Sequence, residues 1–135
     1  MKRIVIPLLL AVVLLAIAVA GYVAKRPAEA TRIDCVDPVA GCALGDARSV
    51  RFSIQPAPLE AFGMTVVAPG AARVSAEFQM VAMDMGFNRY DLREAPAGTF
   101  SSRVTLPACV SGQHEWVLYL DIDGAHYAMP FSTRE

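Results

Sequence analysis

Residues 116–131 read WVLYLDIDGAHYAMPF, and apolar and polar side chains alternate on both sides of the pair Asp123-Gly124. An Asp-Gly pair between two alternating runs is typical of a β-hairpin with a two-residue turn. Counting outward from this turn gives the expected cross-strand pairs, which are Ile122 with Ala125, Leu120 with Tyr127, Leu118 with Met129 and Trp116 with Phe131. Three of these four pairs join large apolar residues on one face, so the stretch predicts a hairpin that packs against a core. Pro130 has no N–H to donate, which predicts that the second strand lies at a sheet edge.

Period-two alternation continues upstream of the hairpin. Such alternation is typical of half-buried strands, and it recurs in residues 50–54, 64–67, 74–80, 88–93 and 99–106. Turn residues such as Pro69-Gly70 and the run at 95–98 separate these stretches. About seven short strands with turns between them predict an all-β fold, an immunoglobulin-like antiparallel β-sandwich, over residues 48–135.

The first 26 residues, 1–26, hold an apolar run between two basic pairs, Lys2-Arg3 and Lys25-Arg26. The run from Ile4 to Ala24 contains no charged residue, and its twenty-one residues suffice to cross a bilayer as one helix. Two interpretations remain open: an uncleaved transmembrane anchor, or a signal segment cleaved after the Ala-Val-Ala sequence at 18–20. We favour the anchor, because the apolar run continues beyond that sequence as far as the second basic pair. Both interpretations place the following domain outside the cytoplasm.

Residues 27–47 are polar and rich in turn residues, and they predict a tether between the apolar segment and the β-domain. Cys35 and Cys42 lie in this stretch, and an oxidising compartment favours a disulfide between them. A Cys42–Cys109 pair is the alternative, because connectivity does not follow from sequence. With Cys35 and Cys42 paired, Cys109 is either an odd thiol or a small buried apolar residue.

The charge of the chain argues against nucleic acid as a partner. From Pro27 onward, eight arginines and no lysine stand against thirteen acidic residues, a formal net charge of −5. The arginines are scattered along the sequence, whereas binding to a phosphate backbone requires a basic patch or stripe.

Few residues suggest catalysis. His126 falls opposite Asp121 on the outer face of the expected hairpin, but the sequence places no nucleophile beside this pair. The sequence contains no phosphate-binding loop, no dinucleotide fingerprint and no clustered pair of carboxylates. We therefore expect a protein that is not an enzyme.

Residues 78–88 carry three of the six methionines of the chain, Met80, Met83 and Met85. Thioether sulfur is a soft ligand that favours Cu(I) over harder divalent ions. In an extended segment, residues two positions apart point to the same side, so Met83 and Met85 can converge on one ion. Met80 shares the parity of the preceding core positions and joins such a site only where a bulge resets the register.

A third ligand would come from the turn-rich segment before Trp116, where Cys109 and His114 lie. Loops of this kind cluster at the ends of a sandwich. Thiolate is a strong ligand of soft metals, but only where Cys109 is not in a disulfide. The competing interpretation is packing, since methionine is a flexible filler of apolar cores and of adaptable binding surfaces.

The motifs between Val74 and Phe131 follow in a set order, which is a Met-x-Met-Gly turn at 83–86, Tyr90-Asp91-Leu92, Gly98-Thr99-Phe100, Leu106-Pro107, Gly112, a strand with Trp116 and the Asp123-Gly124 hairpin. This order resembles the FixH-like and YtkA-like group of membrane-anchored periplasmic domains, in which one N-terminal helix precedes an immunoglobulin-like sandwich with an early methionine loop. Met83, Met85 and Met80 match that loop. The chain departs from the group in lacking a histidine near the loop and a Met/His-rich tail, and in its three cysteines.

The resemblance implies copper handling or cytochrome oxidase assembly in a bacterial envelope. We therefore expect a single-pass inner-membrane protein with its domain in the periplasm, or a secreted periplasmic protein where the first segment is cleaved. Its cargo would be Cu(I), and its partner a membrane protein complex or a copper-accepting protein. The alternative function is a protein-interaction module of an envelope complex that binds no metal.

Overall fold

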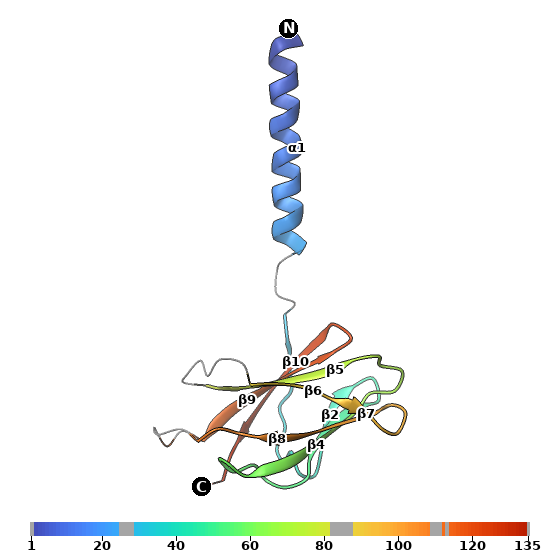
Figure 1. Cartoon of the computed structure of the whole chain (residues 1–135), viewed down its shortest axis with the longest axis vertical. Helices are drawn as coiled ribbons and strands as arrows, with labels where there is room; N and C mark the ends of the chain where they lie inside the picture. The colour runs from blue at the N-terminus through green and yellow to red at the C-terminus, as the bar shows by residue number, and fades with distance from the viewer. Residues whose placement is uncertain (1, 25–28, 82–87, 109–111, 113, 135) are drawn as a thin grey trace.

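The computed structural model describes residues 2–24, 29–81, 88–108, 112 and 114–134. Within these residues, one helix is followed by ten strands that form two five-stranded sheets (Figure 1). The helix α1 spans Lys2–Ala24. Its stretch Ile6–Ala24 has a mean hydropathy of 2.7, and the rest of the described chain buries none of it. The expected N-terminal apolar segment is thus a helix whose length and composition suit a membrane anchor or a signal sequence.

The first sheet contains the predicted hairpin. Its strands, in spatial order, are β1 (Thr31–Arg32), β10 (Ala125–Ser132), β9 (Glu115–Ile122), β5 (Val74–Met80) and β6 (Arg89–Asp91). The second sheet contains, in spatial order, β2 (Cys42–Gly45), β3 (Arg48–Phe52), β4 (Ala61–Val67), β8 (Thr99–Thr105) and β7 (Arg93–Glu94). Apart from the parallel pair β1–β10, neighbouring strands in both sheets run antiparallel.

This strand order confirms the predicted immunoglobulin-like sandwich. Strands β3, β4, β8 and β7 take the order of strands A, B, E and D of that fold, and β10, β9 and β5 take the order of G, F and C. Strand β6 extends the second of these groups at its edge, while β1 and β2 are added at the outer edges beside β10 and β3. Both added strands lie within residues 27–47, the stretch expected to be a tether.

The β9–β10 register agrees with the count from the turn: Ile122 pairs with Ala125, Leu120 with Tyr127, Leu118 with Met129 and Trp116 with Phe131. The edge prediction for the last strand was wrong, because β1 lies outside β10. However, β1 pairs only with Tyr127 and Ala128. Pro130 lies beyond those two residues, where no N–H donor is needed.

The single strand expected at residues 88–93 is divided between the two sheets. Its first part is β6, which pairs with β5, and the continuation beyond Leu92 is β7, which pairs with β8. Leu92 is buried at this crossing. A period-two pattern cannot reveal such a change of sheet. Tyr90 in β6 and Leu92 at the crossing both face the core, so the alternation continues without a break.

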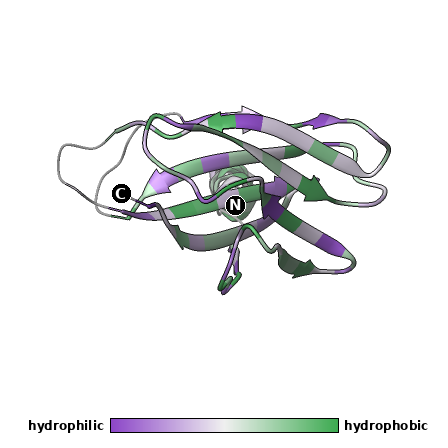
Figure 2. Cartoon of the chain, turned by 90° about the horizontal axis from the view of Figure 1, so that it is seen from below, coloured by the Kyte–Doolittle hydropathy of each residue, from purple (hydrophilic) through white to green (hydrophobic). Residues whose placement is uncertain are grey.

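The two sheets are joined by an aromatic core. Phe52 and Phe62 of the second sheet contact Phe131 and Phe78 of the first sheet, with ring centroids 5.4 and 6.1 Å apart. Tyr90 packs edge-on against Phe78 at 5.9 Å. Hydrophobic and hydrophilic residues alternate along the strands (Figure 2), which is the pattern of one buried and one outward face per sheet.

Candidate functional site

Met80 is a core residue at the end of β5. Its side chain is 5% exposed, and its cross-strand partner on β9 is Trp116. The parity that placed Met80 in the core is therefore confirmed. We leave Met80 out of the proposed ligand set, because its thioether packs among apolar side chains.

The other predicted ligands lie at or beyond the limits of the described chain. Met83 and Met85 belong to residues 82–87 and Cys109 to residues 109–111, which are outside the described residues. His114 is described and is half-buried. The described residues nearest to the predicted ligands are therefore those that flank these segments.

The flanking residues lie side by side at one end of the first sheet. The backbone N–H of Val81 donates to the carbonyl of Glu115, at 3.2 Å. Val81 directly precedes the segment that carries the two methionines, and Glu115 directly follows His114. The chain thus leaves the sheet toward Met83 at the point where it returns to the sheet from Cys109 and His114.

His114 is fixed by the residue after β10. Its carbonyl accepts a hydrogen bond from the N–H of Thr133 at 2.8 Å, and its Nδ1 lies 3.4 Å from the Thr133 hydroxyl oxygen. Thr133 is itself buried. The backbone around this imidazole is therefore held at the same end of the sheet as Val81.

Two buried side-chain donors at this end have no hydrogen-bond partner among the described residues. They are Nδ2 of Asn88 and Nε1 of Trp116. The two residues flank the end of β5, because the carbonyl of Asn88 accepts from the N–H of Phe78, and Trp116 lies opposite Met80. A buried donor without an acceptor costs on the order of 1–3 kcal/mol. The described residues alone therefore leave these two buried donors without an acceptor at this end of the sandwich.

The disulfide Cys35–Cys42 is present, with its Cα atoms 5.6 Å apart. The alternative Cys42–Cys109 pairing is therefore wrong. The chain has three cysteines, so this pairing leaves Cys109 with no second cysteine to bind within the chain. The disulfide also ties the stretch that follows β1 in the first sheet to the start of β2 in the second.

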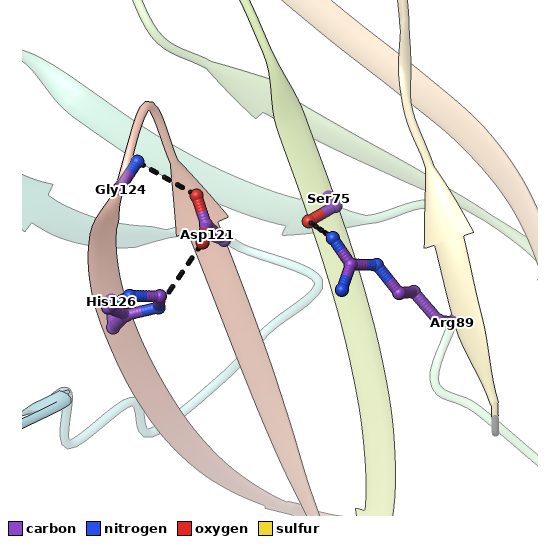
Figure 3. Close-up of polar contacts among 5 residues, drawn as sticks. All are labelled: Ser75, Arg89, Asp121, Gly124 and His126. Atoms are coloured by element: carbon purple, nitrogen blue, oxygen red, sulfur yellow. Dashed lines mark hydrogen bonds and ion pairs between the residues drawn. The ribbon is translucent and has the colours of Figure 1, made fainter. Parts of the chain in front are cut away.

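A polar cluster lies on the outer face of the first sheet (Figure 3). As predicted from the register, His126 faces Asp121, with Nδ1 3.3 Å from the carboxylate Oδ2. The other oxygen of Asp121 accepts the N–H of Gly124 at 2.9 Å. The Ser75 hydroxyl accepts a hydrogen bond from the Arg89 guanidinium at 3.0 Å. Because Asp121 stands between His126 and Ser75 in the sheet, these residues do not form a Ser–His–Asp relay.

Two hollows lie on this outer face. The larger is an open groove of ≈ 720 Å³ beside the disulfide, and the smaller hollow, of ≈ 320 Å³, lies over the polar cluster. Tyr119 lines both. In the described part of the chain, no group of three or more His, Cys, Asp or Glu side chains is placed to hold a metal ion.

Sequence reasoning missed the larger groove. One signal was available, since four neighbouring outward positions of β9 and β10 carry the uncharged residues Val117, Tyr119, Ala128 and Pro130, although Glu115 and Asp121 also face outward on β9. The sequence gives no such signal for the wall of the groove. Val36 lies there because the disulfide and the fold of residues 27–47 bring it beside the first sheet.

The fold and these surfaces define a β-sandwich domain of immunoglobulin-like topology behind one apolar N-terminal helix. Comparisons of the chain with protein-family models, with curated proteins and with solved structures gave no match.

Proposed function

We propose that this protein is a membrane-tethered accessory protein of a bacterial envelope that binds Cu(I) as cargo through Met83 and Met85. In this proposal α1 is a single-pass anchor in the inner membrane, and the sandwich lies in the periplasm. The protein would pass the ion to a copper-accepting protein or assist the assembly of a membrane complex such as a cytochrome oxidase.

The observation that carries this proposal is the hydrogen bond between Val81 and Glu115. It joins the chain entering the methionine segment to the chain leaving the segment with Cys109 and His114. Two thioethers from one segment and a third donor from the other can then meet at one end of the sandwich. Soft sulfur ligands of this kind select Cu(I).

Cys109 is the preferred third ligand in this proposal. The Cys35–Cys42 disulfide leaves it without a cysteine partner in the chain, and thiolate is the softest ligand available here. His114 is the alternative, because imidazole also binds copper and the backbone of His114 adjoins Glu115.

A competition titration of Cu(I) against a colorimetric chelator tests the proposal. The full chain in detergent is compared with a Met83→Leu/Met85→Leu double variant and with Met80→Leu, a matched control at a buried methionine. We expect one Cu(I) per chain in the wild type and in Met80→Leu, and loss of binding in the double variant. Absence of binding in the wild type, or equal binding by the wild type and the double variant, would contradict the proposal.

The groove on the outer face of the first sheet favours a second candidate, a protein-interaction module that binds no metal. In that case Met83 and Met85 serve only for packing. The titration separates the two candidates, because the interaction module predicts no Cu(I) bound by the wild type.

A further inference from the structure

We propose that the larger groove on the outer face of the first sheet docks an apolar extracytoplasmic segment of a protein embedded in the same membrane. This inference rests on α1 being a retained anchor, as in the proposed function, and is independent of the copper site.

The groove is of mixed composition: apolar residues form its floor and stand at two of its sides, while Arg32, Gln55, Glu115 and Ser132 supply polar and charged lining. Its floor is formed by Val117 and Tyr119 of β9 with Pro130 of β10, and Val36 and Val81 stand at its sides. Val36 is 103% exposed, Val81 is 61% exposed and Tyr119 is 39% exposed. Single exposed apolar residues are ordinary, whereas several around one hollow mark an interaction site.

The outer face of the second sheet has a different composition. Its outward positions are occupied mainly by small polar residues and arginines, among them Ser49, Arg51, Thr65, Ser101 and Arg103. Such a surface is well solvated. A hollow of ≈ 610 Å³ lies on that face as well, but Ser49, Arg51 and Thr65 line it, whereas Val117, Tyr119 and Pro130 line the groove on the first sheet.

The wall of the groove is preformed. The disulfide fixes Cys35 to β2, and the carbonyl of Pro38 accepts the N–H of Phe52 at 2.9 Å. Within the same stretch, Asp37 accepts the N–H of Val39 at 2.8 Å. A groove held in this way loses little conformational entropy when a partner binds, which favours affinity.

The short linker between α1 and β1 limits where the occupant of the groove can lie. Only six residues, 25–30, separate the end of α1 at Ala24 from β1 at Thr31. Fully extended, six residues span about 20 Å. Arg32 of β1 lines the groove, so the groove is held close to the membrane surface, within reach of the extracytoplasmic segments of another membrane protein.

Charge and shape disfavour the other occupants. The chain from Pro27 onward has a net charge of −5, which opposes docking to anionic lipids. A hollow pressed against the same hollow of a second copy leaves unfilled space, and interfaces are packed as densely as protein interiors. A convex peptide segment with apolar side chains fills the groove without either penalty.

The groove also adjoins the proposed cargo site. Val81 lines the groove and directly precedes the segment with Met83 and Met85. A partner seated in the groove would therefore contact the residue after which the methionine segment begins.

Site-specific photo-cross-linking in native membranes tests this inference. A photoreactive amino acid replaces Tyr119 in the groove of the full chain, and the matched control replaces Ser101 on the outer face of the second sheet. We expect the Tyr119 position to give an adduct with an integral membrane protein, attached through a segment outside the bilayer, at a yield at least about tenfold above Ser101. Adding Val117→Arg should abolish the adduct, because it places a charge on the floor of the groove.

Insertion of about twenty Gly and Ser residues between Arg26 and Pro27 tests the role of the short linker between α1 and β1. Effective concentration falls roughly as the −3/2 power of linker length, so we expect about a tenfold loss of the adduct. Adducts with lipid, with a soluble protein or with a second copy of the chain would overturn the inference, as would equal yields at both positions or no adduct. The Met83→Leu/Met85→Leu variant should cross-link like the wild type, which separates failure of the copper proposal from failure of this one.

Discussion

The carboxylate of Asp123 joins the β9–β10 turn to the residues that precede β5. Its oxygens accept the N–H groups of Ala72 and Arg73, at 3.0 and 2.8 Å, and its own N–H donates to the carbonyl of Arg73. These two backbone hydrogen bonds lower the pKa of Asp123 below its ordinary value of 3.8, and the positive charges of Arg48 and Arg73 act in the same direction. The turn that predicts the hairpin thus also fastens the hairpin to a neighbouring loop.

This contact predicts a pH-dependent contribution to stability. Because the folded-state pKa of Asp123 is depressed, the contribution is present above pH 3.8 and is lost as the pH falls through the folded-state value. We expect Asp123→Asn to be less stable than the wild type at neutral pH, and the difference to shrink below pH 3.8. Asparagine is the matched change, since it tolerates the positive φ of 51° at this position. Urea unfolding at several pH values measures the difference, and a gap that does not depend on pH would contradict the account.

Phe78 is the centre of the aromatic core. It is fully buried, and its ring contacts those of Phe62, Tyr90 and Phe131. We expect Phe78→Ala to lower the free energy of unfolding by about 3–5 kcal/mol. The outward neighbour Gln79→Ala is the control, with an expected change within about 0.5 kcal/mol. Chemical denaturation measures the free energy of unfolding of both variants. Equal losses would argue against the observed orientation of β5, in which Phe78 faces the core and Gln79 faces outward.

Among the elements, β1 and β2 depend most on the disulfide. Cys35–Cys42 closes a loop with a sequence separation of 7, and a loop of that length predicts a contribution of about 2–3 kcal/mol to stability. We expect the Cys35→Ser/Cys42→Ser variant to lose about that much in urea unfolding. Thiol counting on the unfolded, unreduced wild type should give one thiol per chain, from Cys109. A count of three would contradict the disulfide.

The strands differ in how far they follow from sequence. The β9–β10 register could be counted because a two-residue turn fixes it and because a one-residue slip would turn every apolar side chain outward. β1 could not be found, since Thr31 and Arg32 are both exposed and are held only by pairing with a strand almost a hundred residues away. The division of residues 88–93 between sheets was hidden for a related reason, because parity shows which way a side chain faces but not which strand lies beside it.

The candidate site shows the same limit. The His126–Asp121 contact and the core position of Met80 follow from counting along strands, and the structure confirms both. Two other features depend on what lies opposite in space: the Nε1 of Trp116, which has no hydrogen-bond partner among the described residues, and the groove beside Val36. Sequence periodicity carries no information about those neighbours.

At the scale of the whole molecule, the fate of α1 decides how the sandwich is used. The proposed anchor predicts that the mature chain keeps residues 1–26 and resists extraction from membranes by alkaline carbonate. Intact-mass measurement of the membrane fraction checks this, with detergent release as the positive control. A chain that begins after Ala20 and lies in the soluble fraction would mean a cleaved signal sequence, and would remove the basis of the docking inference.

The way in which the chain enters the sandwich has a mechanical consequence. A pull on the residue before β1 acts along β1, parallel to β10, so it loads their backbone hydrogen bonds in shear. Beyond β1, the covalent bond between Cys35 and Cys42 passes the load to the opposite sheet. Tension from the N-terminal side is therefore borne first by the few hydrogen bonds between β1 and β10, and then by a covalent bond that spreads it over both layers.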